Sequence, residues 1–140
     1  MTIAERQQAV IDEFNAIADW EERYRRIIEY GRALAAMEEA HKTDKNKVKG
    51  CQSTVWLHAV MKDGRIALQG DSDAMIVRGL IALLFRVYDG ATPTEATATP
   101  PDFINEIGLG RNLSQTRANG LAAMVKQIQL YAAVFKAMQK

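Results

Sequence analysis

Residues 53–69 read STVWLHAVMKDGRIALQ, and this stretch decides which kind of fold the chain can form. Its first part, residues 53–60, is rich in β-branched and aromatic side chains and therefore favours a strand. Asp63-Gly64 is a strong signal for a tight hairpin turn. Residues 65–69 supply the returning strand, with its large apolar residues on one face. The sequence thus predicts an antiparallel β-hairpin near the middle of the chain.

Helical patterns lie on both sides of the hairpin, with apolar residues at three- and four-residue steps. The predicted helices cover residues 3–18, 20–34, 74–88, 102–107 and 115–138. Asp19 and Ser114 are the expected N-caps of the second and the last helix. Residues 70–73 are expected to end the sheet and cap the helix over 74–88. That helix is apolar nearly all round, so we expect it at the centre of the fold.

The remaining segments lack a helical pattern. Residues 40–50 are polar and charged, which indicates a surface loop, and residues 46–49 are expected to add a third strand to the hairpin. Residues 92–101 hold all three prolines and are expected to be mainly a connection. Helices before and after a hairpin indicate the α+β class, a small antiparallel sheet packed against helices. Since nothing marks a domain boundary, residues 1–140 are expected to form a single domain.

The composition argues against several classes of function. The chain has 140 residues, of which 48% are hydrophobic, and its formal net charge is +1, so no global field attracts nucleic acid or an anionic membrane. Its single cysteine excludes an intramolecular disulfide and any cysteine-rich zinc or iron–sulfur site built by this chain alone. No apolar stretch has the length of a signal peptide or a membrane span. We therefore expect a cytoplasmic protein that binds no membrane, nucleic acid or metal.

The single cysteine, Cys51, follows a basic run. Lys45, Lys47 and Lys49 precede it closely, and Gly50 is its immediate neighbour. Positive charge favours the nucleophilic thiolate, which is only about 3% of an ordinary thiol at pH 7. A lone cysteine can equally be an inert residue packed as a small hydrophobe. Cys51 is therefore a candidate site residue whose role depends on its surroundings.

A catalytic thiol needs a base beside it, and the chain offers only His41 and His58. His58 lies in the predicted first strand, where a cross-strand role is expected, and His41 opens the polar loop and is expected in solvent. The lysines before Cys51 lack an aromatic platform for nucleic acid. Four alternatives stay open. They are a carrier that receives a group from another protein, a thiol peroxidase or hydrolase, a scaffold for zinc or a cluster, and a binding module with an incidental cysteine.

The run from Val48 to Leu57, VKGCQSTVWL, resembles the Gly-Cys-Gln-Ser-x-Val-Trp-Leu motif of SufE-type cysteine desulfuration proteins. Three further blocks are similar to the family pattern and occur in the same order. They are Trp20–Tyr24 with Ile27–Glu29 and Gly31, Gly70–Ala74 with Ile76–Val77 and Gly79–Ile81, and Leu113–Ser114 with Arg117, Asn119–Leu121 and Met124. The blocks cover nearly the whole chain. Gln52-Ser53 favours the SufE branch over the related CsdE branch.

The resemblance implies a function that the residues alone leave open. In this family a pyridoxal-phosphate-dependent cysteine desulfurase of the SufS type takes sulfur from free cysteine and holds it as a persulfide. The SufE-type partner accepts that sulfur on its own cysteine, here Cys51, and stimulates the desulfurase. It passes the sulfur to iron–sulfur assembly on a SufBCD-type scaffold and needs no cofactor of its own. The implied fold is α+β, like that of the scaffold IscU, and the monomer and the homodimer both stay open.

The resemblance also implies candidate site residues. Beside Cys51, the loop and partner-binding candidates are Lys49, Gly50, Gln52 and Ser53. Farther along the chain the candidates are Asp73, Arg117 and Asn119, of which Arg117 is expected to orient the loop.

Two expectations follow for the region around the thiol. The resting thiol is expected to lie against apolar residues, with Trp56 and Leu57 in range, so that burial outweighs the lysines until a partner docks. The family's Leu-Pro stretch after the second helix is replaced by residues 34–39, LAAMEE. Without that proline the second helix is free to run about a turn longer.

Overall fold

The predicted hairpin is present and helices flank it on both sides, in a computed structural model that describes residues 2–139. The elements, in chain order, are α1 (Ile3–Asn15), α2 (Trp20–Ala33), the 3₁₀ turns η1 (Glu39–His41) and η2 (Asp44–Asn46), β1 (Val55–Lys62), β2 (Arg65–Ser72), α3 (Met75–Tyr88), α4 (Pro93–Ala98), α5 (Phe103–Glu106), α6 (Leu109–Asn112) and α7 (Gln115–Met138). The α+β class is confirmed, with β1 and β2 forming a two-stranded antiparallel sheet in the described part of the chain.

The turn chemistry sets the register of the hairpin. Asp63 and Gly64 have φ values of 54° and 76°, the left-handed conformations that a type I′ turn requires. Lys62 therefore pairs with Arg65, and the ladder continues until Val55 lies opposite Ser72. β2 thus extends past Gln69, where the sequence pattern predicted its end. Gly70 lies within the strand, and its position suits glycine because side-chain atoms of Leu57 and Phe85 lie 2.9 Å from where a Cβ would be.

The predicted third strand over residues 46–49 is wrong. Within residues 2–139 this segment makes a single isolated bridge, Lys47 with Trp56, and Val48 donates a backbone hydrogen bond of 2.9 Å to Val55. Asn46 belongs to η2, whose 3₁₀ turn bends the chain away from the sheet. Only Val48 of this segment is buried, so there is no apolar face to hold a longer ladder.

Helix α3 is the centre of the fold, as its composition predicted, and it packs against α2, β2, α1 and α7. Two glycines let α2 and α3 approach so closely that the backbone of one helix contacts that of the other. A Cβ at position 79 would lie 2.1 Å from the carbonyl oxygen of Ile27, and one at position 31 would lie 2.7 Å from that of Met75. Ile27 is fully buried at this crossing. The crossing therefore tolerates no side chain at either glycine.

Other element boundaries differ from the sequence pattern. α1 ends at Asn15 rather than residue 18, and α2 ends at Ala33, since Leu34 turns to an extended backbone that lets Met37 reach the core. The absent proline therefore does not lengthen α2. Residues 93–98 form α4 instead of a plain connection. Thr92 caps this helix and Pro93 occupies its first turn, where a missing N–H costs nothing.

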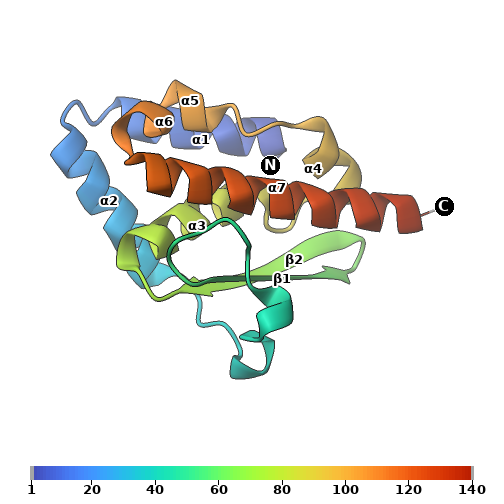
Figure 1. Ribbon diagram of the computed structural model, residues 1–140. Coiled ribbons are helices and arrows are strands. Elements are labelled where there is room, and N and C mark those ends of the chain that lie inside the picture. Colours follow the sequence, from blue (N-terminus) through green and yellow to red (C-terminus); the bar gives the residue numbers. More distant parts are fainter. Residues whose placement is uncertain (1, 140) are drawn as a thin grey trace.

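The long helix α7 spans the molecule, with the hairpin on one side and α1, α5 and α6 on the other (Figure 1). Its N-cap is Ser114, as predicted, and the buried face carries Leu121, Met124, Ile128 and Ala132. Within residues 2–139 no helix combines the length and the apolar character needed to cross a membrane.

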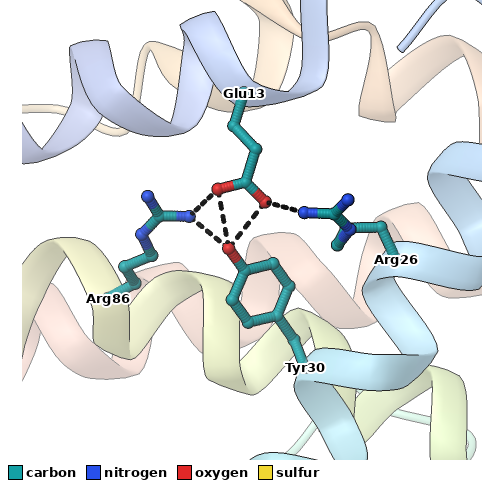
Figure 2. A network of polar contacts seen from close by, with 4 residues as sticks. All are labelled: Glu13, Arg26, Tyr30 and Arg86. Atoms are coloured by element: carbon teal, nitrogen blue, oxygen red, sulfur yellow. Dashed lines mark hydrogen bonds and ion pairs between the residues drawn. The ribbon is translucent and has the colours of Figure 1, made fainter. Parts of the chain in front are cut away.

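A polar network ties α1, α2 and α3 together (Figure 2). The Glu13 carboxylate accepts hydrogen bonds from Tyr30 at 2.7 Å and from Arg86 at 2.6 Å, and it forms an ion pair with Arg26 at 3.2 Å. Burial raises the pKa of the Glu13 carboxyl, but the hydrogen bonds and the two positive charges outweigh this, so the net shift is downward. The carboxylate therefore stabilises the fold above the ordinary glutamate pKa, and this contribution is lost as the pH falls through the lowered pKa.

The α2–α3 crossing makes a direct prediction. Gly79→Ala should lower the free energy of unfolding by about 3 kcal/mol, because the added Cβ collides with backbone that cannot move without separating the helices. The matched control is Gly110→Ala in α6, where the nearest heavy atom to an added Cβ is 3.8 Å away. The control should lower the free energy of unfolding by no more than about 1 kcal/mol. Urea unfolding followed by circular dichroism measures both, and equal effects of the two substitutions would contradict the close crossing.

Candidate functional site

The loop between η2 and β1 lies beside α7 (Figure 1), and its contact with Gly120 places Cys51 on the N-terminal half of that helix. The Cys51 Sγ lies 3.6 Å from the carbonyl oxygen of Gly120, to which the thiol donates a weak hydrogen bond. A Cβ at position 120 would lie 3.6 Å from the same sulfur, an ordinary contact distance. Alanine therefore also fits at position 120, whereas a side chain longer than alanine would compete with the thiol for this space.

Local backbone features hold the loop in this position. Gly50 has a φ of 93°, a conformation that L-residues rarely adopt, and a Cβ there would lie 3.5 Å from the Cβ of Ala123. After the thiol, Asp73 closes the end of the sheet: its carboxylate accepts the Thr54 N–H at 3.1 Å. The loop is thus fixed at both ends, by α7 before the cysteine and by the start of β1 after it.

Cys51 lies at the wall of a cavity of about 270 Å³, which we call the thiol cavity. Its lining residues are Cys51, Gln52, Ser53, Val55, Val77, Leu80, Ser114, Thr116, Arg117, Gly120, Leu121 and Met124. The apolar side comes from β1, α3 and α7, and the polar side comes from the loop and the first turn of α7. The cavity is large enough for a small group on the sulfur.

Burial raises the pKa of the Cys51 thiol above its ordinary value. The three lysines that precede it do not line the thiol cavity. They line a separate groove on the other side of the loop, together with Lys126 of α7; we call this the lysine groove. At rest, therefore, burial governs the thiol and keeps it protonated at neutral pH, as expected from the resemblance.

No histidine lines the thiol cavity in the described part of the chain. The rings of His41 and His58 stack on each other with centroids 3.9 Å apart, and the His41 Nδ1 lies 3.1 Å from the Gln69 side-chain oxygen. The expectation that His41 is in solvent is thus wrong, while His58 lies opposite Gln69 across the hairpin as expected. Burial and the neighbouring His41 lower the pKa of His58. The two rings form a pair on the sheet and supply no base to the thiol.

Within residues 2–139, no three histidine, cysteine, aspartate or glutamate side chains lie together in positions that could hold a metal ion. Among these described residues, Cys51 has no second ligand of this kind in the lining of its cavity.

The structure brings some of the candidate residues together and separates others. Gln52, Ser53 and Arg117 line the thiol cavity with Cys51. The Arg117 backbone N–H also donates to the Ser114 hydroxyl at 3.2 Å, within the cap of α7. Asp73 is outside the cavity and closes the sheet instead.

The remaining candidates lie beside the cavity. Asn119 is exposed on α7 and accepts a hydrogen bond of 2.8 Å from Gln115. Lys49 lies in the lysine groove, and Gly50 forms the turn that precedes the thiol.

Sequence patterns missed the walls of the cavity. Trp56 and Leu57 were expected to shelter the thiol, but neither lines the cavity; Val77, Leu80 and Met124 do so instead. These residues come from α3 and α7, so only the tertiary packing reveals their proximity to Cys51. Gly120 is the one wall residue that the sequence could have indicated, because an isolated glycine inside a long helical pattern is typical of a place where another segment packs against the helix.

The buried thiol predicts a specific pH dependence of alkylation. The rate at which iodoacetamide modifies Cys51 should rise with pH through a midpoint above that of the same chain unfolded in urea, because burial raises the pKa of the folded thiol. Rates measured by mass spectrometry between pH 6 and pH 10 test this. A midpoint below that of the unfolded chain would contradict burial as the dominant effect and would assign thiolate activation to the lysines.

Comparison with known proteins gives the family of the chain. The family model described as "SufE: Fe-S metabolism associated domain" matches residues 8–132. An uncharacterised SufE-like protein of Synechocystis is 41% identical over 127 residues, covering 91% of this chain and 80% of that protein. An uncharacterised SufE-like protein of Rhizobium etli is 43% identical over 130 residues, covering 89% of this chain and 88% of that protein.

The fold also has a counterpart among solved structures. The solution structure of a hypothetical protein from Thermus thermophilus matches with a TM-score of 0.80 at 21% identity, covering 94% of this chain and 96% of that one. This likeness concerns the fold alone. The family match spans most of the chain, from α1 to α7, and includes the loop that seats the single thiol on Gly120. The chain therefore belongs to the SufE family.

Proposed function

We propose that this protein accepts sulfur from a SufS-type cysteine desulfurase as a persulfide on Cys51, stimulates that desulfurase, and passes the sulfur to iron–sulfur cluster assembly on a SufBCD-type scaffold. The protein acts as a carrier and not as an enzyme, and it uses no cofactor of its own. The proposal assigns it to the cytoplasm, because a lone free thiol suits a reducing compartment.

One observation carries the proposal. The only thiol of the chain lies in a cavity whose lining, among the described residues, includes neither a histidine nor an acidic residue. A thiol enzyme needs a base at hydrogen-bond distance to generate its nucleophile. A carrier needs only the sulfur, space for a second sulfur atom, and access for a partner. The thiol cavity offers these features.

The transfer step balances without a further reactant. The Cys51 thiolate attacks the terminal sulfur of the donor persulfide, and a new S–S bond forms to Sγ. The S–S bond within the donor breaks at the same time, and the donor cysteine leaves as a thiolate. Cys51 now carries the persulfide, and the proton that it lost ends on the donor thiol. No net oxidation occurs, because one disulfide-type bond replaces another.

The resting seat and the transfer step place opposite demands on Cys51. Burial protects a bound persulfide from oxidation, but it keeps the free thiol protonated and out of reach of a donor. The proposal therefore requires the loop to leave α7 when the desulfurase docks. Within residues 2–139 the thiol itself makes one polar contact, the weak bond to Gly120, and its other contacts are apolar packing on the core.

The thiol-enzyme alternative predicts turnover of peroxide or ester substrates by the isolated chain, with loss of activity when both histidines are replaced. The separation of the His41–His58 pair from the thiol cavity argues against it. The scaffold alternative predicts zinc or iron in the purified protein, which metal analysis measures. The incidental-cysteine alternative predicts that Cys51→Ser has no effect on any function of the chain.

The proposal predicts sulfur transfer to one atom. When the protein is incubated with its desulfurase and free cysteine, Cys51 should gain about 32 Da, the mass of one sulfur atom, by persulfide formation. Mass spectrometry of the intact protein and of its peptides, after thiol blocking, measures the gain and its position. The desulfurase should also turn over faster in the presence of the protein.

Cys51→Ser is the control for this experiment. It removes the nucleophile and keeps the size of the side chain, so both the mass gain and the stimulation should be absent. If the serine variant accepts sulfur and stimulates the desulfurase as well as the wild type, the proposal is wrong.

A further inference from the structure

The lysine groove lies beside the thiol cavity and is separate from it. It has a volume of about 320 Å³ and runs between the loop before Cys51 and one face of α7. Lys45, Lys47 and Lys49 line it from the loop, and Lys126 lines it from α7. Elements far apart in the sequence thus bring four positive charges to one concave surface.

Little within the fold balances these charges. Among the ion pairs of residues 2–139, one reaches the groove: Lys47 pairs with Asp44 at 3.1 Å. The Asp44 side chain is 96% exposed and the Lys47 side chain 50% exposed, so this pair contributes little to stability. The net charge of the chain is only +1, so the groove is a local concentration of charge and does not reflect a basic protein.

Burial outweighs the lysines at the thiol in the resting state. They lie outside the thiol cavity, and burial is the one cause of the raised pKa of Cys51. The groove therefore needs a different explanation from the thiolate activation that its place in the sequence suggests.

The lysine groove and the thiol lie next to each other along α7. The loop runs antiparallel to the helix, with Cys51 against Gly120 and Gly50 against Ala123. Ala123, Lys126 and Leu130 then line the groove from the same helix. The span from Gly120 to Leu130 covers about 15 Å of helix axis. A segment bound in the groove thus lies within about 15 Å of the sulfur, measured along the axis of α7.

An apolar stripe extends the groove toward the C-terminal end of α7. Leu130, Val134 and Met138 are 56%, 48% and 73% exposed, and their four-residue spacing places them on one face of the helix. This face therefore offers positive charge near the thiol and apolar contact farther away. A complementary partner carries acidic side chains at one end and apolar side chains at the other.

We infer that the lysine groove is the docking surface for an acidic segment of the sulfur-donating protein, with the apolar stripe of α7 contacting the residues that flank this segment. The inference rests on the proposed function, because it assigns the partner of the same site. Docking there places the donor against the loop that must move. Because the loop and α7 form the groove together, the acidic segment binds while the loop is seated and brings the donor next to Cys51 before the loop moves.

Charge reversal in the groove tests this inference. Lys49→Glu/Lys126→Glu should raise the dissociation constant for the SufS-type desulfurase by about tenfold or more, because like charges then face the acidic segment. The matched control is Lys62→Glu/Lys136→Glu, which makes the same change in net charge at exposed lysines outside the groove. Lys49→Arg/Lys126→Arg keeps the charges. Both the control and the arginine variant should bind within about twofold of the wild type.

Two further readouts separate docking from chemistry. The affinity of the wild type should fall between about 50 mM and about 300 mM NaCl, and that of the charge-reversed variant should change less. In the transfer assay the charge-reversed variant should need a higher desulfurase concentration than the matched control to load Cys51 with sulfur.

The outcomes distinguish this inference from the proposed function. If the wild type accepts sulfur and the charge-reversed variant binds with the same affinity, the docking surface is elsewhere and the inference is overturned while the sulfur-acceptor proposal stands. Equal losses in the charge-reversed variant and in the matched control also overturn it, since they show an effect of net charge alone. If the wild type takes up no sulfur and binds no desulfurase, the proposed function fails and this inference fails with it.

Discussion

The crossing of α2 and α3 is the constraint on which the rest of the structure depends. The two helices approach until a Cβ on residue 79 would lie 2.1 Å from the carbonyl oxygen of Ile27, so only glycine fits. This contact fixes α3 against α2 and leaves its other faces for α1, the hairpin and α7. Val77 and Leu80, which flank Gly79, form one wall of the thiol cavity. The packing that holds the fold together therefore also shapes the surroundings of the single cysteine.

A glycine also lies at the functional site. At Gly120 the backbone of α7 accepts a weak hydrogen bond from the Cys51 thiol, and an added Cβ would lie at an ordinary contact distance, whereas at Gly79 only glycine fits. The two contacts differ in strength. The α2–α3 crossing buries Ile27 completely, whereas Cys51 is partly buried and makes one weak hydrogen bond to α7. Under the proposed function the thiol needs protection at rest and access when a donor docks.

Much of this could be predicted from the sequence, because the signals were local. The Asp63-Gly64 turn, the apolar α3 and the Ser114 cap all lie where their patterns indicate. The third strand was wrong because the 3₁₀ turn through Asn46 removes its first residue and only Val48 is buried there. α4 was missed although Thr92 and Pro93 form a good helix start, since a cluster of prolines also favours a plain connection. Cys51 could be found from its motif, but its apolar walls come from α3 and α7, and no local pattern joins them to the loop.

The central claim is that the seat on Gly120 shelters Cys51 at rest, and Gly120→Leu tests it most directly. The leucine side chain must occupy the space that the sulfur now fills, whereas Gly120→Ala adds only a Cβ at an ordinary contact distance of 3.6 Å. The measurement is the rate at which iodoacetamide alkylates Cys51 at pH 7 in each folded variant. The account predicts a clearly faster reaction for the leucine variant and a rate near that of the wild type for the alanine variant. Equal rates for the leucine variant and the wild type would contradict it.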